Sequence, residues 1–300
     1  MAYRSSFRRR FNRRRGYPIR RKYGGRRRSS YRRGNYRRGG IRRRNRVIPK
    51  RRVLSPYNNK NDVIRPAHNS NNSPIAPIGS TASTPNTLVL FCPTARQRPV
   101  LESTALGSRE SRHGRFSDKI YLSGYKERIN ISVTNSCLWR RIVFWCYVTI
   151  PAAMGPKKGG SDASPYNYYT RQMTPIENSQ DLRDIVFEGN QGVDYGVDTL
   201  IQAPVNTRFI NVQMDKTYRL NPNTTQSKIY NFNHYYRGGR LWYMDDESGN
   251  FNSGSPWSVP NRTSKGNMYI LDIFSPGVQV SETTSHGVFQ CEGRLYWSES

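Results

Sequence analysis

The 300-residue sequence is poor in the residues from which catalytic and metal-binding sites are built. It holds four His and four Cys, and no HxH, HExxH or CxxC pattern brings any of them together. The common signatures of a metal site are therefore missing. The phosphate-binding pattern GxxxxGK[ST] and the nucleophile pattern GxSxG are missing as well, which leaves nucleotide hydrolysis and α/β-hydrolase chemistry without support. We expect no enzyme activity, no metal and no cofactor.

Long apolar runs are also absent. No stretch of about 18 apolar residues occurs, and no short apolar segment follows the basic N-terminus, so we predict neither a membrane span nor a signal peptide. Without a secretory signal, disulfides are not expected. The four cysteines are Cys92, Cys137, Cys146 and Cys291. Cys137 and Cys146 flank or lie in one apolar stretch, which favours buried free thiols.

Acidic residues are missing from the beginning of the chain, where the first is Asp62. Residues 1–52 carry 24 of the 49 Lys and Arg residues, which leaves 25 bases against all 20 acids and a net charge of +5 for the rest of the chain. Such a self-repelling, weakly apolar segment cannot bury enough surface to offset the entropy of ordering it. We therefore predict a disordered basic arm over 1–52 that binds a polyanion.

The composition of this arm indicates a nucleic acid as the polyanion. Tyrosines and glycines punctuate the arginines, as in the near-repeat YRRGNYRRGG at 31–40. Arginine supplies charge and a stacking plane, and tyrosine offers a π face to bases. The predicted nucleic-acid contacts are Arg8, Arg9, Arg10, Arg13, Arg14, Arg15, Arg20, Arg21, Lys22, Arg26, Arg27, Arg28, Tyr31, Arg32, Arg33, Tyr36, Arg37 and Arg38.

A nuclear-localisation signal alone would need only about five to eight basic residues. The 24 basic residues of the arm exceed that number. We expect such a signal in addition to nucleic-acid binding. Its densest candidate is the cluster Arg42, Arg43, Arg44, Arg46, Lys50, Arg51 and Arg52.

Beyond the arm, the composition divides the chain once more. Residues 53–86 are rich in Asn, Ser, Pro and Thr and are typical of a linker. The folded body is expected over 87–300. Its apolar pattern has mostly period two, as in 128–134, and 142–148 is apolar on both faces, which indicates a central strand covered on both sides. The best helix candidate is 179–188, with Ser179 or Asp181 as its cap.

The body therefore reads as eight to ten strands, one short helix and several long loops. Strands without alternating helices favour an antiparallel sandwich or barrel. We predict an all-β fold, a single jelly roll that forms an eight-stranded antiparallel β-sandwich, although patterning alone does not separate this topology from other sandwiches.

Two charged groups in the body have open interpretations. Arg96, Arg98, Arg109, Arg112 and Arg115, together with Arg140 and Arg141, fit either an ion-pair network or additional nucleic-acid contacts. The acidic run 245–247 fits a solvated turn between strands, or else a cation site or a salt bridge between subunits. It lacks the spacing of a calcium-binding EF-hand loop.

Several stretches of the body closely resemble capsid proteins of genomoviruses, the gemycircularvirus group, and more distantly those of geminiviruses and circoviruses. They are 92–96 (CPTAR), 124–129 (GYKERI), 139–144 (WRRIVF), 245–249 (DDESG), 272–274 (DIF) and 295–297 (LYW). The resemblance runs from about residue 87 to 300, in order. It implies a jelly-roll coat protein that forms a T=1 shell of about 60 copies around a circular single-stranded DNA genome. It also implies a host nuclear import receptor as partner, and location in the virion and the host nucleus.

Two other classes of protein remain as alternatives. A host nucleic-acid-binding protein, ribosomal or chromatin-like, can also carry a basic tail on a globular body. A nuclease or replication protein would be expected to show clustered His and carboxylate residues, and the sequence shows no such cluster.

Overall fold

The structure is a computed structural model, and it describes residues 59–64, 66, 75–81, 84–96, 112–150, 157–159, 168–170, 173–175, 179–222, 227–248, 251–276 and 284–299. The chain divides between residues 49 and 50, and every described residue belongs to the second unit.

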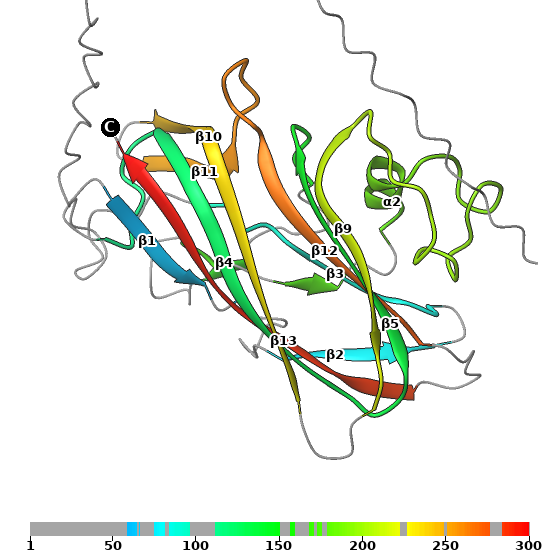
Figure 1. The fold of residues 1–300 in the computed structure, drawn as a ribbon. Coiled ribbons are helices and arrows are strands. Elements are labelled where there is room, and N and C mark those ends of the chain that lie inside the picture. The colour runs from blue at the N-terminus through cyan, green and yellow to red at the C-terminus, as the bar shows by residue number, and fades with distance from the viewer. Residues whose placement is uncertain are drawn as a thin grey trace, which may run out of the picture. The chain divides into compact units, whose positions relative to one another are not determined.

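Two antiparallel sheets form this unit (Figure 1). The six-stranded sheet has the order β1-β13-β4-β10-β11, and β2 also pairs with β13. Its strands are β1 (Asn59–Ile64), β2 (Ile75–Ser80), β4 (Lys119–Val133), β10 (Lys228–Ser248), β11 (Phe251–Ser258) and β13 (Thr284–Glu299). The five-stranded sheet has the order β8-β3-β12-β5-β9. Its strands are β3 (Thr87–Phe91), β5 (Cys137–Cys146), β8 (Thr174–Pro175), β9 (Ile210–Leu220) and β12 (Asn267–Pro276).

The pairing of these strands is nested along the chain. β2 pairs with β13, β3 with β12, β4 with β10, and β5 with β9, all antiparallel. The chain thus forms one long hairpin whose successive pairs alternate between the two sheets. The contacts β13–β4 and β12–β5 then close each sheet. This is the jelly-roll arrangement, and the predicted fold class is confirmed.

The core between the sheets is aromatic. Trp139 on β5 is fully buried. Its ring lies 4.8 Å from that of Tyr218 on β9, 5.1 Å from Tyr230 on β10, 6.0 Å from Phe232 on β10 and 6.1 Å from Phe274 on β12. Each such pair stabilises the fold by about 0.5–1.5 kcal/mol beyond the effect of burying its apolar area. Because Tyr230 and Phe232 belong to the six-stranded sheet and the other rings to the five-stranded one, the cluster joins the two sheets.

The helix was predicted correctly. α2 (Gln180–Val186) begins after Ser179, which has the extended backbone of an N-cap but makes no side-chain cap hydrogen bond. Leu182 and Val186 are buried. Figure 1 shows α2 beside β9, on the side of the five-stranded sheet that faces away from the six-stranded one. The remaining strands, β6 (Lys157–Gly159) and β7 (Tyr168–Thr170), pair with each other.

The linker prediction for 53–86 is wrong where β1 and β2 lie, because both strands pair with β13. The chain therefore enters the fold before residue 87. The period-two pattern at 128–134 belongs to the long strand β4, which begins already at Lys119. β5 is central in its sheet and covered on both faces, as predicted from its apolar pattern.

Candidate functional site

Every predicted contact residue of the basic arm, from Arg8 to Arg52, lies outside the described residues. The assignments of these residues to nucleic-acid binding and to nuclear localisation therefore stay predictions.

Arg96 and Arg115 belong to one buried network at the end of β13. The Arg96 guanidinium donates to Asp62 Oδ2 at 2.8 Å and to the His113 carbonyl at 2.9 Å, and it lies 4.3 Å above the Trp297 ring. Arg115 Nε donates to the Arg96 carbonyl at 3.0 Å. The two side chains are 3% and 1% exposed, so neither is available to a ligand at the surface.

Arg140 attaches the segment that follows α2 to the outer side of the five-stranded sheet. Its guanidinium forms a bidentate pair with Asp215 on β9, at 2.9 and 2.7 Å. The same group donates to the carbonyls of Leu200 and Ala203, at 3.0 and 2.7 Å. Such bidentate, charge-assisted bonds have a fixed geometry, so this arginine positions the loop.

Arg141, the next residue, points to the opposite side of β5 and lies between the sheets. It bonds both carboxylate oxygens of Asp272 on β12, at 3.0 and 3.1 Å, and Glu127 on β4 of the other sheet. Trp139 Nε1 donates to Asp272 Oδ1 at 2.8 Å, and His234 Nε2 lies 3.4 Å from Glu127 Oε1. One cation thus links three strands and both sheets.

Burial shapes the protonation of this cluster. Burial raises the pKa of Asp272 to about 6, although the positive charge of Arg141 acts in the opposite direction. Burial lowers the pKa of Arg141, but Asp272 and Glu127 outweigh that effect and raise the pKa above its ordinary value. Arg141 therefore stays charged, while Asp272 can take up a proton at weakly acidic pH.

The ion-pair interpretation is confirmed for Arg96, Arg140 and Arg141, although these pairs are buried within the fold. Arg115 is buried as well and donates to the carbonyls of Arg96 and Ser117. None of the four is placed to form a nucleic-acid surface. Arg112 is exposed, and Arg98 and Arg109 lie outside the described residues.

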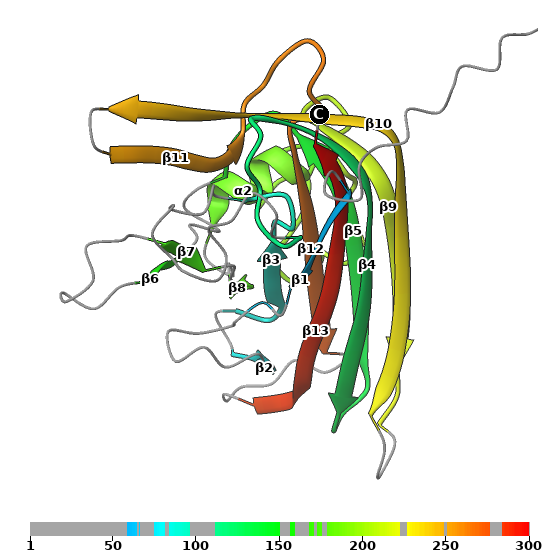
Figure 2. The ribbon, with the colours of Figure 1, turned by 90° about the vertical axis from the view of Figure 1, so that its left-hand side faces the viewer.

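A different set of cations is presented on the outer face of the six-stranded sheet. Figure 2 looks onto the side where β13, β4 and β10 run next to one another. We define the basic face as the cations Lys119, Lys126, Arg128, Arg240 and Arg294 with the aromatic residues Tyr121, Trp242 and Tyr296. Four of the cations are exposed, and Lys119 and the three rings are half-buried.

The cations and rings of the basic face contact one another. Lys119 Nζ lies 4.9 Å from the centroid of the Trp242 ring and 5.7 Å from that of Tyr121. Arg240 on β10, which stands opposite Tyr121, lies 5.5 Å from the centroid of the same ring. Lys126 Nζ lies 5.7 Å from the Tyr296 ring. Cation–π contacts of this kind are worth about 0.5–1 kcal/mol at exposed sites, so they favour the placement of a cation beside each ring.

The charges of this face are not balanced. Lys126 and Arg294 stand directly opposite each other on neighbouring strands, while Arg128 stands opposite the acid Glu292. Among the described residues, Lys119, Lys126, Arg240 and Arg294 take part in no ion pair. This face was not predicted from the sequence, because the period-two pattern at 128–134 covers only one of its cations, Arg128.

The described residues contain no group of three or more His, Cys, Asp and Glu side chains placed to hold a metal ion. The acidic run 245–247 lies within β10 and pairs with 252–254 of β11, so the interpretation as a turn between strands is wrong. The side chains of the run are outside the described set. None of the helical segments in the described part of the chain has the length and apolarity of a membrane span.

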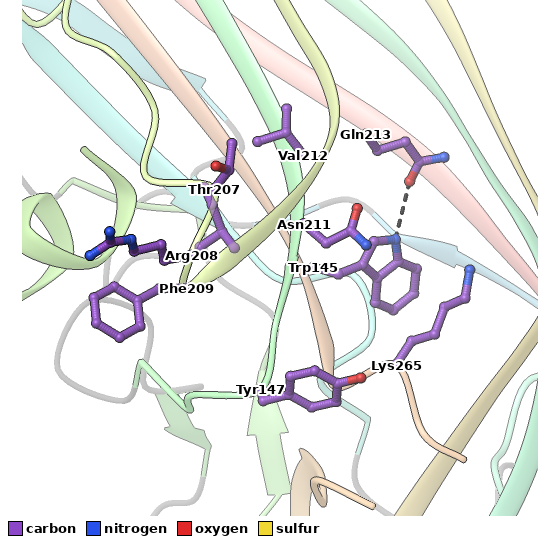
Figure 3. A pocket seen from close by; sticks show the side chains of 10 residues that line it. Trp145, Tyr147, Thr207, Arg208, Phe209, Asn211, Val212, Gln213 and Lys265 are labelled. Carbon is purple, nitrogen blue, oxygen red and sulfur yellow. Dashed lines mark hydrogen bonds between the residues drawn. The ribbon is translucent and has the colours of Figure 1, made fainter. Parts of the chain in front are cut away.

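An aromatic groove of about 600 Å³ lies at the edge of the five-stranded sheet (Figure 3). Trp145 forms part of its wall and donates from Nε1 to Gln213 Oε1 at 3.2 Å. Tyr147 and Phe209, at its rim, are 55% and 59% exposed. Arg208 and Lys265 add positive charge to its lining. Exposed apolar side chains gathered in this way are typical of contact surfaces.

Comparison with known proteins assigns no family to this chain. No protein-family model and no curated protein matches the sequence. Among solved structures, the chain is similar to the VP1 protein of Trichodysplasia spinulosa-associated polyomavirus in complex with sialylated glycooligomers. Sequence identity is 8%, 82% of this chain and 95% of that chain are covered, and the TM-score is 0.20.

A second structure of the same VP1 protein matches with 7% identity, over 80% of this chain and 76% of that chain, at a TM-score of 0.10. Similarities this weak carry no functional argument, and the jelly roll is assigned from the strand pairing of this chain itself. The resemblance to genomovirus capsid proteins stays an expectation from the sequence.

Proposed function

We propose that this chain is a viral coat protein of the genomovirus type. In this proposal the jelly-roll body self-associates into a T=1 shell of about 60 copies, and the basic arm condenses a circular single-stranded DNA genome inside it. One observation carries the proposal. The first 52 residues hold 24 basic residues and no acidic one, and a jelly-roll body follows them in the chain.

The charge of the arm matches a genome of kilobase scale. If about 60 copies close a shell, 24 bases in each neutralise about 1,400 phosphates by counterion release. The packaged DNA is then of that length or somewhat longer. Binding through phosphates needs no particular base sequence, which suits the packaging of an entire genome.

The body offers surfaces of opposite character for contacts between copies. The aromatic groove combines exposed rings with Arg208 and Lys265. The segment 179–200 exposes five acids, which are Asp181, Asp184, Glu188, Asp194 and Asp198. Val193, in the same segment, is 84% exposed. Because one chain carries both the apolar, cationic groove and this acidic segment, we infer that the groove docks a second copy.

The arm also contains the candidate nuclear-localisation signal at 42–52, and we propose that it delivers newly made subunits to the host nucleus through an import receptor. A lining hidden inside a shell cannot be read by a receptor. Import of subunits before assembly resolves that conflict.

Electron microscopy and sedimentation of the full-length protein, with and without circular single-stranded DNA, test the coat function. We expect closed particles of one size that protect the DNA from nuclease. A protein that stays monomeric at every salt concentration, with or without DNA, would refute the proposal. Cosedimentation with ribosomes or chromatin without closed particles would favour a host nucleic-acid-binding protein instead.

A version that lacks residues 1–52 separates the two parts of the proposal. We expect it to keep its β-type circular dichroism and to lose DNA packaging. If fluorescent cargo fused to 42–52 stays outside the nucleus of host cells, the import proposal fails while the packaging proposal stands.

A further inference from the structure

We propose that the basic face of β13, β4 and β10 is a second binding surface for single-stranded DNA, separate from the arm. The inference deepens the proposed function and rests on it only for the choice of DNA over RNA. It depends on the sign of the charge, on the half-buried rings and on their order along the strands.

The placement of like charges is the first step. Lys126 and Arg294 stand directly opposite each other across the β4–β13 ladder. A like-charged cross-strand pair destabilises a sheet, and neither side chain takes part in an ion pair with any described residue. The face holds five cations against one described acid, Glu292. A bound anion would relieve this repulsion.

The basic face also carries three aromatic rings on which bases could stack. Tyr121, Trp242 and Tyr296 are half-buried, and each lies within 6 Å of a lysine or arginine of the face. Aromatic planes on which bases stack, flanked by cations that neutralise phosphates, are what sequence-tolerant single-strand binders use. Duplex DNA keeps its bases stacked on each other, so it would satisfy the cations and leave the rings unused.

The cations and rings of the basic face follow one another along β4. From Lys119 to Arg128 the face runs along nine residue steps of β4, which is about 30 Å at the rise of a strand. Rings and cations recur over this whole length, with Trp242 and Tyr121 at one end and Tyr296 beside Lys126 further along. The track is long enough for several nucleotides.

The competing occupant of a basic sheet face is an acidic surface of another copy. The acids at 181–198 are such a surface, but they would leave the three rings without a stacking partner. The experiment must separate these two occupants.

Photo-crosslinking of the full-length protein locates the contact without a mutation. Oligo-dT that carries 5-bromodeoxyuridine is bound, irradiated and mapped by peptide mass spectrometry. We expect crosslinks within 119–128, 240–242 and 294–296 in addition to the arm. Crosslinks confined to the arm would overturn the inference, even when closed particles that package DNA still form. Stronger crosslinking of oligo-rU than of oligo-dT would show that the face is an RNA site.

Salt dependence measures the phosphates involved. For single strands, each phosphate contact makes the slope of log K (K the association constant) against log [salt] more negative by about 0.7. The double variant Lys126→Ala with Arg294→Ala should therefore have a slope that is less steep by about 1.4. The matched control is Lys216→Ala with Arg219→Ala on β9, which removes the same charge from exposed positions of the other sheet. Equal slopes for the two double variants would refute a local contact. Unchanged DNA binding with lost particle assembly would identify the face as a subunit contact instead.

The rings have a separate signature. Trp242→Ala should weaken binding of oligo-dT by about fivefold or more, since one stacked base contributes that much, and it should leave the salt slope unchanged. Circular dichroism verifies that the variant is folded. An unchanged affinity in a folded variant would remove stacking from the proposal.

Discussion

Replacing Arg141 tests how the two sheets are held together. The side chain is 1% exposed and lies between Asp272 on one sheet and Glu127 on the other. Arg141→Met keeps most of the volume and removes the charge, which leaves two buried carboxylates without their cation. Breaking a buried ion pair in this way costs about 3–5 kcal/mol. A loss of this size is a large part of the stability of an ordinary domain.

Denaturant unfolding of dilute, unassembled full-length subunits at high salt measures this loss. Lys216→Met is the matched control, because Lys216 is exposed on β9 and surface substitutions usually change stability by less than about 0.5 kcal/mol. The triple variant Arg141→Met, Glu127→Gln, Asp272→Asn removes all three charges. It should recover much of the loss, since neutral replacement of a buried ion cluster is often tolerated. Wild-type stability for Arg141→Met, or no recovery in the triple variant, would refute the reasoning.

The same cluster gives the unfolding free energy a pH dependence of known sign. The pKa of Asp272 is about 6 in the folded protein against 3.8 as its ordinary value. The folded state therefore holds this proton over a range where the unfolded state has released it, and the contribution of Asp272 to stability is full below pH 4. It declines as the pH rises to about 6, by roughly 3 kcal/mol at most. Asp272→Asn should remove this decline, and identical pH profiles of the two proteins between pH 4 and 7 would contradict the assignment.

Three further predictions concern other parts of the body. Gly266→Ala should destabilise the fold by about 1–3 kcal/mol in thermal unfolding, because residue 266 has φ +77° and a Cβ there would meet the Cys146 carbonyl; an unchanged melting temperature would show that the backbone can adjust. The four cysteine thiols should react with a thiol reagent only when the protein unfolds, because all four are buried. Burial also raises the pKa of Cys92 to about 12 and that of Cys137 to about 11, which keeps these thiols protonated. Rapid labelling of native subunits would contradict this prediction. Phe209→Ser should raise the protein concentration needed for assembly at least tenfold without loss of subunit stability, because it removes an exposed apolar side chain from the groove; assembly at the wild-type concentration would exclude the groove as a contact between copies.

The elements that the sequence predicted best are those with clear periodicity and full burial. The apolar run is buried over 142–146 and the short stripe of α2 is packed as its pattern predicts. The last two residues of the predicted run, Tyr147 and Val148, lie beyond β5 and are exposed, so the prediction was wrong there. β1 and β2 were missed because their sequences lack regular apolar alternation. Both strands owe their position to hydrogen bonding along β13 and to a few buried residues such as Ile64 and Ile78.

The roles of the arginines could not be read from the sequence for a related reason. Arg140 and Arg141 are neighbours in a strand, so they point to opposite faces of the sheet. Each is buried beside an acid from a distant part of the chain. The residues of the basic face could not be predicted for a different reason. The ladders that β4 forms with its neighbours shift register between Tyr296 and Trp297 on β13 and between Tyr235 and Gly239 on β10. A break of this kind changes which residues point outward, and only the fold shows that Lys119 and Lys126 share a face.

The basic face and the segment 179–200 carry charges of opposite sign. The outer face of the six-stranded sheet holds five cations and one described acid, and the segment 179–200 holds five exposed acids and the buried Arg183. Figure 1 shows this segment on the far side of the five-stranded sheet. Packaged DNA would attract the basic face and repel the acidic segment, so we expect the basic face to line the interior of a particle and the exposed Val193 to be reachable from outside. In intact particles an affinity tag at 193 should bind its ligand, while the Lys126 amine should resist acylation until disassembly. Acylation of Lys126 in intact particles would show that DNA does not set the orientation of the subunit.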